Sequence, residues 1–173
     1  YLGLGDSEGR HPYQLKEPYG TAVVDMLRAV RYYAAFENNQ FIVNDQLFMA
    51  GYSEGGYATM AVHQIIERDY SNEFNITMSF PMAGAYSMSG LMVDLMLDQE
   101  PYGQPFYFPY VLFSYLDYYP SIGTVEEYLL AEYVFLAEWF DGYHSSGEIN
   151  DAMPEIPITI MKPDSISSFE DNS

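Results

Sequence analysis

One short stretch constrains the fold of this chain more than any other: a serine lies between glycines where an apolar run gives way to a helical pattern. The chain reads LFMAGYSEGGYATMAVHQIIE at this point, with the serine at position 53. Residues 46–52 predict a short buried strand, and the apolar spacing of residues 54–68 predicts an amphipathic helix. A strand, a sharp turn and a helix in this order are typical of a parallel α/β protein.

Further elements alternate along the first half of the chain. Apolar residues recur at the helical period over residues 19–36, and residues 76–80 alternate as a strand would. Helix, strand, helix and strand with short connections predict a right-handed βαβ layout with parallel strands. Tyr1–Leu2 is a candidate strand end before a glycine-rich loop. Residues 86–144 are rich in Tyr, Phe, Met and Leu, and we expect helices joined by proline turns there rather than further strands.

Composition excludes several classes of protein. The chain has 173 residues, 49% of them hydrophobic, which suffices for one domain with a real core. Its 25 acidic and 6 basic residues give a net charge of −19, which repels nucleic acid and anionic membranes. There is no cysteine and the histidines show no metal-binding spacing, so we expect neither a metal nor another cofactor. No apolar run approaches the ~18 residues of a membrane span, so no stable membrane anchor is predicted.

The Gly-x-Ser-x-Gly pattern around Ser53 has two interpretations. In the first, a sharp turn holds Ser53 as a nucleophile in a strained conformation at the carboxyl end of the strand. Gly51 and Gly55 are then required because side chains would clash across the turn, and Gly56 gives room where the helix crosses the sheet. The backbone N–H of Glu54 is then a donor to an oxyanion. In the second, this is a glycine-rich turn that binds a phosphate or nothing; the strand before it and the helix after it favour the first.

Two segments carry a resemblance to a known family. GYSEGGYATMAVHQIIE resembles the nucleophile elbow of α/β-hydrolases. YLGLGDSEGRHPY, followed by a helix containing DMLRAVRYY, is similar to bacterial serine hydrolases related to the secretory lipases, in which an Asp-Tyr-x-Gly-x-Gly loop precedes the elbow. Tyr1, Gly3 and Gly5 match this loop, and His11–Tyr13 match its continuation. FDGYHSSGEIN and MKPDS resemble, more loosely, the end of the family's cap region, so that the resemblance covers essentially the whole chain.

The resemblance implies a fragment of an α/β-hydrolase fold: a parallel sheet core with βαβ units plus a helical cap insertion. Residues 1–85 would form the central part of the core with the elbow, 86–155 the cap or lid, and 156–173 the start of the return to the core. The family's chain order is serine, acid, histidine, so the acid and the base are expected outside this chain, which we interpret as a piece of a longer protein. We expect the piece alone to be inactive, and its half-sheet with open edges to aggregate.

None of the three histidines is a strong candidate for the base that a serine nucleophile needs. His63 lies too far along the helix that Ser53 begins. His144 falls in the cap-like part and is expected at the surface or at a hinge. His11 lies in a loop before the serine, where a structural role is the simpler expectation.

The function that the resemblance implies is cleavage of carboxylic esters, lipid esters included, through an acyl-enzyme on Ser53. The partner would be a small-molecule ester. Two alternatives stay open: a serine peptidase of the same fold, and a non-catalytic binding protein on a hydrolase scaffold. The aromatic segments either line an acyl pocket or pack the cap helices. The sequence does not settle the localisation; a secreted or periplasmic protein is the hypothesis, and the acidic composition is common on exported proteins.

Overall fold

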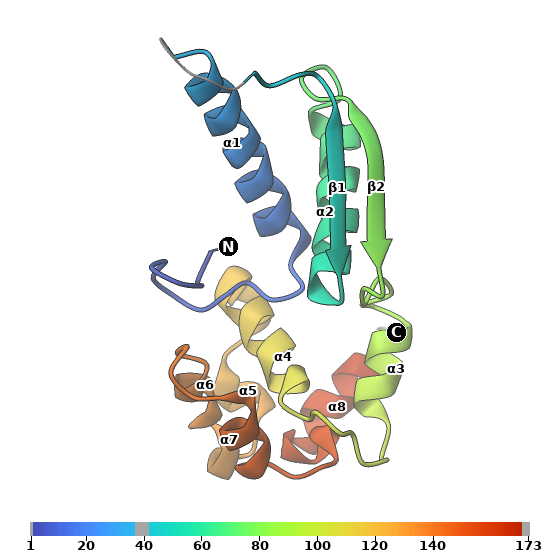
Figure 1. The fold of residues 1–173 in the computed structure, drawn as a ribbon. Helices are drawn as coiled ribbons and strands as arrows, with labels where there is room; N and C mark the ends of the chain where they lie inside the picture. The colour runs from blue at the N-terminus through green and yellow to red at the C-terminus, as the bar shows by residue number, and fades with distance from the viewer. Residues whose placement is uncertain (1, 37–41, 171–173) are drawn as a thin grey trace. The chain divides into compact units, whose positions relative to one another are not determined.

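A computed structural model describes residues 2–36 and 42–170, which fall into two compact units (Figure 1). Unit 1 contains Gln14–Tyr86, and unit 2 combines Leu2–Tyr13 with Ser87–Ser173. Each unit has its own core of buried apolar side chains. Tyr1 lies outside the described residues, and Leu2 lies in a turn, so the expected strand end is not found in the described part. The division into core, cap and returning segment stays a prediction.

Unit 1 is a helix followed by a strand–helix–strand motif. Its elements are α1 (Lys16–Ala34), β1 (Leu47–Tyr52), α2 (Glu54–Asp69) and β2 (Ile76–Met82). The two strands pair in parallel and α2 connects them, which confirms the predicted parallel βαβ layout (Figure 1). Helix α1 begins three residues before the predicted start at Tyr19 and includes Pro18 in its first turn. A proline is tolerated there, because the N–H groups of the first turn form no intrahelical hydrogen bond that it could remove.

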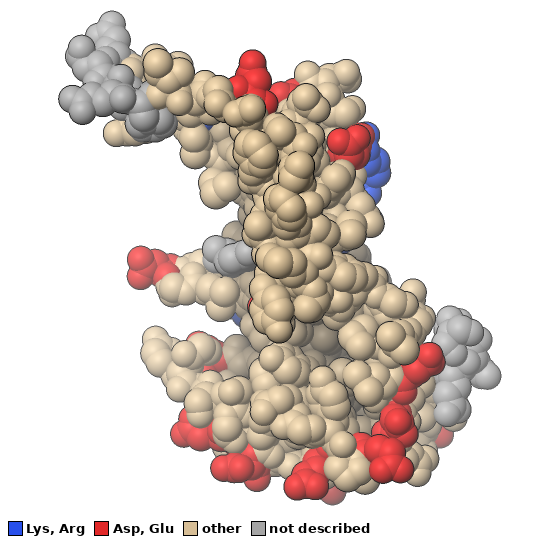
Figure 2. Space-filling model, turned by 45° about the vertical axis from the view of Figure 1, so that its right-hand side comes forward, with Lys and Arg blue, Asp and Glu red and all other residues tan. Residues whose placement is uncertain are grey.

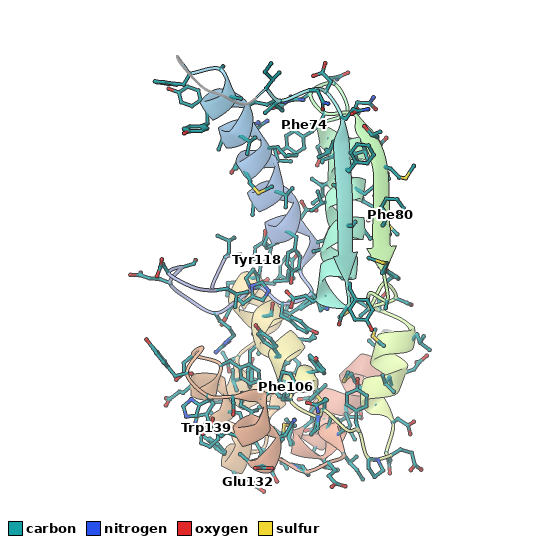
Figure 3. The ribbon with its side chains drawn as sticks, in the orientation of Figure 1. Phe74, Phe80, Phe106, Tyr118, Glu132 and Trp139 are labelled. Atoms are coloured by element: carbon teal, nitrogen blue, oxygen red, sulfur yellow. The ribbon has the colours of Figure 1, made fainter. Side chains whose placement is uncertain are left out.

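One face of this small sheet is covered and the other is open. The buried core of unit 1 lies between α1, α2 and the covered face, and Phe74 points into it (Figure 3). The open face carries large apolar side chains that are 46–73% exposed: Phe48, Tyr52, Met78, Phe80 and Met82. Phe80 projects from β2 in Figure 3, and Figure 2 shows mostly uncharged side chains over this part.

Unit 2 consists of short helices. They are α3 (Leu91–Leu97), α4 (Tyr107–Tyr118), α5 (Val125–Tyr128), α6 (Leu136–Trp139), α7 (Ser146–Asp151) and α8 (Pro163–Glu170), with 3-10 turns at Pro120–Ile122, Ala131–Tyr133 and Pro157–Ile160. The prediction of helices over 86–144 is confirmed. Among the described residues of this unit, the β pairing is an isolated bridge between Leu129 and Met161.

The loop before α1 belongs to unit 2 through its side chains. The ring of Tyr13 stacks on Tyr110 of α4, with centroids 4.4 Å apart and planes 4° from parallel. Arg10 forms an ion pair of 2.7 Å with Asp117 and donates to the carbonyl of Ala137. A basic side chain and an aromatic ring thus attach this glycine-rich loop to the helices.

Candidate functional site

Ser53, the predicted nucleophile, lies in the turn between β1 and α2. Its backbone has φ 57° and ψ −119°, a conformation that costs an L-residue roughly 1–3 kcal/mol. The residue is exposed, at the carboxyl end of a parallel strand. An exposed serine in strained backbone at this end of a strand is the geometry that a nucleophile elbow requires.

Backbone hydrogen bonds hold the strained turn in place. The N–H of Ser53 donates to the carbonyl of Met82 at 2.9 Å, which joins the ends of the two strands. The carbonyl of Ser53 accepts from the N–H groups of Gly56 at 2.9 Å and Tyr57 at 3.1 Å. Ala83, directly after Met82, is also left-handed, with φ 51°. The strain is therefore stored where both strands end.

The three glycines around Ser53 differ in how closely other atoms approach them. A Cβ on Gly51 would collide with the carbonyl oxygen of Gly55, and a Cβ on Gly56 with that of Met82. Both neighbours are backbone atoms that cannot move aside, so the close approaches predicted at Gly51 and Gly56 are confirmed. A Cβ on Gly55 would meet nothing within 4 Å. The predicted clash at Gly55 is wrong, because it is the carbonyl of Gly55, and not its Cα, that faces Gly51.

Glu54 is the first residue of α2. The N–H of the first helical residue has no acceptor within the helix and belongs to the positive end of the helix dipole. An oxyanion formed at Ser53 would therefore lie beside a favourable donor. The side chain of Glu54 has a different partner: the hydroxyl of Tyr19, on α1, donates to its Oε1 at 2.7 Å.

Tyr19 is the residue of this site that the sequence pattern missed. The helical period assigns it to the apolar face of α1, and it is indeed 2% exposed. Its hydroxyl nevertheless reaches across to the residue that follows Ser53. No short motif indicates such a bond, because the two residues are 35 positions apart.

Two of the three histidines lie in unit 2. His11 is buried, and its Nδ1 is 2.7 Å from the carbonyl oxygen of Leu2. The ring of His144 stacks on Trp139 at 4.6 Å, and its Nδ1 is 3.1 Å from both carboxylate oxygens of Asp141. The N–H groups of residues 143 and 144 donate to the same carboxylate, and that of residue 143 contributes most to lowering the pKa of Asp141 to about 2.

The third histidine forms a serine–histidine pair within unit 1. Nδ1 of His63, on α2, lies 2.7 Å from Oγ of Ser79. Ser79 is in the middle of β2, in register with Met49 of β1, so its backbone belongs to the strand ladder. Ser53 lies next to a helix N-terminus that could donate to an oxyanion, whereas Ser79 has no helix N-terminus beside it in the chain.

No group of three or more His, Asp or Glu side chains that could hold a metal ion occurs among residues 2–36 and 42–170. In the same part of the chain, no helix is long and apolar enough to cross a membrane. Figure 2 shows acidic side chains scattered over the face in view, with few basic ones.

Comparison with known proteins finds relatives by structure. No protein-family model matches the sequence, and no curated protein matches it significantly. A Legionella pneumophila protein provisionally described as a hydrolase matches with a TM-score of 0.86 and 30% identity, over 100% of this chain and 46% of its own. Two crystal structures of the rice cell wall degrading esterase LipA from Xanthomonas oryzae match with TM-scores of 0.85 and 0.82 and identities of 24% and 26%. Each of these two matches extends over 99% of this chain and 47% of the LipA chain.

These matches define the class of the fold. The chain is a mixed helix and strand protein with a small parallel sheet, similar in structure to a hydrolase and an esterase. It spans a little less than half the length of each of these structures. We therefore treat the activity of the whole protein as a proposal.

Proposed function

We propose that this chain carries the nucleophile elbow of a serine hydrolase with an α/β-hydrolase fold, and that its substrates are carboxylic esters. The observation that carries the proposal is the left-handed backbone of Ser53, held between a parallel strand and a helix N-terminus. The structural similarity to a protein described as a hydrolase and to an esterase supports the same reaction class.

The reaction would run through an acyl-enzyme. Oγ of Ser53 attacks the ester carbonyl carbon as a base removes its proton, and the N–H of Glu54 stabilises the oxyanion of the tetrahedral intermediate. The bond to the alcohol then breaks as the alcohol oxygen takes up the proton. Water attacks the acyl-enzyme, which releases the acid and restores Ser53. The histidine base and the acid that orients it would come from outside these 173 residues.

Unit 2 would be the cap of this enzyme. Its aromatic side chains pack on one another: Phe113 meets Phe140 edge to face at 5.5 Å, and Phe106 and Tyr110 lie in the same cluster. These contacts stabilise the unit itself. We expect the remaining apolar surface to select the acyl chain, which would extend the substrate range to lipid esters.

The test uses the complete reading frame that contains these residues. Hydrolysis of p-nitrophenyl esters of increasing acyl length is measured for the wild type, for Ser53→Ala and for Ser79→Ala. Ser79 is the matched control, because it is a serine of the same unit that has a histidine partner. We expect Ser53→Ala to lose at least a thousandfold in kcat and Ser79→Ala to keep most of its activity.

Each other outcome has a definite meaning. Activity that survives in Ser53→Ala removes this serine as the nucleophile. A folded protein that cleaves peptide substrates but no ester would be a peptidase of the same fold. A folded protein that cleaves neither would be a binding protein on a hydrolase scaffold.

A further inference from the structure

We propose that Tyr19 is a positioning residue for the oxyanion site: its hydroxyl holds the carboxylate of Glu54 away from the place where negative charge develops during the reaction. The inference rests on the proposed function of Ser53. It concerns a side chain of α1, outside the Gly-x-Ser-x-Gly pattern.

Glu54 presents a conflict within one residue. Its backbone N–H is the proposed donor to the oxyanion, whereas its side chain carries a negative charge a few bonds away. A carboxylate in the first turn is favourable for the helix itself. Beside an oxyanion, the same charge would repel the transition state. The direction of the Glu54 side chain therefore affects the rate.

A hydrogen bond from α1 bears on this conflict. The hydroxyl of Tyr19 donates to Oε1 of Glu54 at 2.7 Å, a distance in the range of short charge-assisted hydrogen bonds. This bond draws the carboxylate toward α1. It also spreads part of the negative charge over a neutral donor, which weakens the field at the helix N-terminus.

The tyrosine ring is held firmly enough to serve this purpose. Tyr19 is 2% exposed, and its ring lies edge to face with that of Tyr57, one turn into α2, at 5.9 Å. The N–H of Gln14, which has a left-handed φ of 58°, reaches the same hydroxyl at 3.4 Å. A hydroxyl that accepts one hydrogen bond while it donates another is polarised and oriented by both.

Packing alone does not account for a tyrosine at this position. Phenylalanine would fill the same core volume without bringing a hydroxyl into a buried place, where an unpaired polar group is costly. The hydroxyl is bonded to the residue that follows the proposed nucleophile. Its position therefore fits a role in catalysis better than a role in the core.

Tyr19→Phe in the complete reading frame is the first test. Because the carboxylate then loses the bond that draws it toward α1, we expect kcat and the rate of the acylation burst on p-nitrophenyl acetate to fall about tenfold, with KM little changed. The double variant Tyr19→Phe/Glu54→Gln should recover most of the loss, because its side chain has no charge to repel the oxyanion. The matched control is Tyr70→Phe, which removes a hydroxyl at the other end of α2.

A second variant keeps the test valid if Tyr19→Phe does not fold. Glu54→Asp retains the charge and suits a first helical turn, but its shorter side chain cannot keep the bond to Tyr19. We expect the same fall in kcat, and a smaller fall at 1 M salt, where an exposed charge is screened.

An unchanged kcat in both single variants would overturn the inference. A loss that glutamine does not relieve would do so too, since it would indicate a structural role. Both results are distinct from failure of the proposed function, in which Ser53→Ala itself remains active.

Discussion

The two units of this chain specify their structures by different means. Unit 2 surrounds its own core, in which Phe113, Leu129 and Leu136 have no exposed surface. Unit 1 buries one face of its sheet and leaves the other open, with Phe48 58% and Phe80 49% exposed. The helical unit therefore depends on side-chain packing, which tolerates small adjustments. The βαβ unit depends, around Ser53, on contacts between backbone atoms, which tolerate almost none.

The largest expected effect is in the core of unit 2, where a substitution can remove a whole buried ring. Phe113 is fully buried, packs edge to face on Phe140, and has the guanidinium of Arg10 5.1 Å from its ring centre. Phe113→Ala should lower the free energy of unfolding of this unit by about 3–5 kcal/mol through the cavity it leaves. Hydrogen exchange followed by mass spectrometry on the complete protein would report the opening of each unit separately.

The control for this prediction lies on the open face of unit 1. Phe80→Ala removes the same ring from a half-exposed position, and we expect a loss below about 1 kcal/mol. Equal losses for the two variants would show that the open face is covered in the complete protein, and the contrast between the units would then disappear.

The second prediction compares two glycines of the Gly-x-Ser-x-Gly pattern, one that is crowded by backbone atoms and one that is not. Gly51→Ala places a methyl group against the carbonyl of Gly55, so we expect a loss of about 2–4 kcal/mol and of most activity. Gly55→Ala meets open space and should be neutral or stabilise α2 by up to about 1 kcal/mol. Thermal melting and ester hydrolysis of both variants would check this. Similar damage from both would restore the steric argument for Gly55.

The glycine pair also shows what the sequence can and cannot predict. The strand, the helix and the serine between them follow from hydrophobic periodicity and glycine placement, and their bounds in the structure differ by a residue at most. The prediction that this strand is buried is wrong, because its residues alternate between half-buried and exposed. The pattern could not say which glycine is crowded, because that depends on the direction of the Gly55 carbonyl.

Contacts between residues far apart in the sequence could not be predicted from the hydrophobic pattern either. The bond from Tyr19 to Glu54 and the bond from the N–H of Ser53 to Met82 join segments that only the tertiary fold brings together. In unit 2, aromatic composition predicted helices and packing, but not that Leu2–Tyr13 belongs to the same unit. Local propensity is readable from one sequence, whereas these pairings depend on topology.

The third effect is a gain in stability. Ser53 has φ 57° and ψ −119°, which glycine adopts far more readily than serine. We expect Ser53→Gly to raise the free energy of unfolding of unit 1 by about 1 kcal/mol while abolishing activity, and Ser53→Ala to abolish activity with no such gain. Chemical denaturation of the two variants would compare them. A Ser53→Gly variant no more stable than Ser53→Ala would show that the turn holds no strain.

The smallest effect contrasts two carboxylates whose pKa values are lowered by different donors. In unit 1 the guanidinium of Arg28 lowers the pKa of Glu73 through a side-chain hydrogen bond. In unit 2 it is chiefly the backbone N–H of Tyr143, with that of His144, that lowers the pKa of Asp141 to about 2. The unfolded value for an aspartate is near 3.9, so the contribution of Asp141 to stability is present above about pH 4 and is lost as the pH falls through about 2.

Both N–H groups donate to Oδ1 of Asp141, so Asp141→Asn can keep this acceptor and remove the charge. We expect the variant to melt at a slightly lower temperature than the wild type at pH 6 and at the same temperature near pH 2. Added salt should weaken the exposed Arg28–Glu73 pair but leave the difference at Asp141 nearly intact, because backbone N–H groups carry no net charge for salt to screen. A difference that vanished at high salt and pH 6 would instead assign the stabilisation to the neighbouring ring of His144.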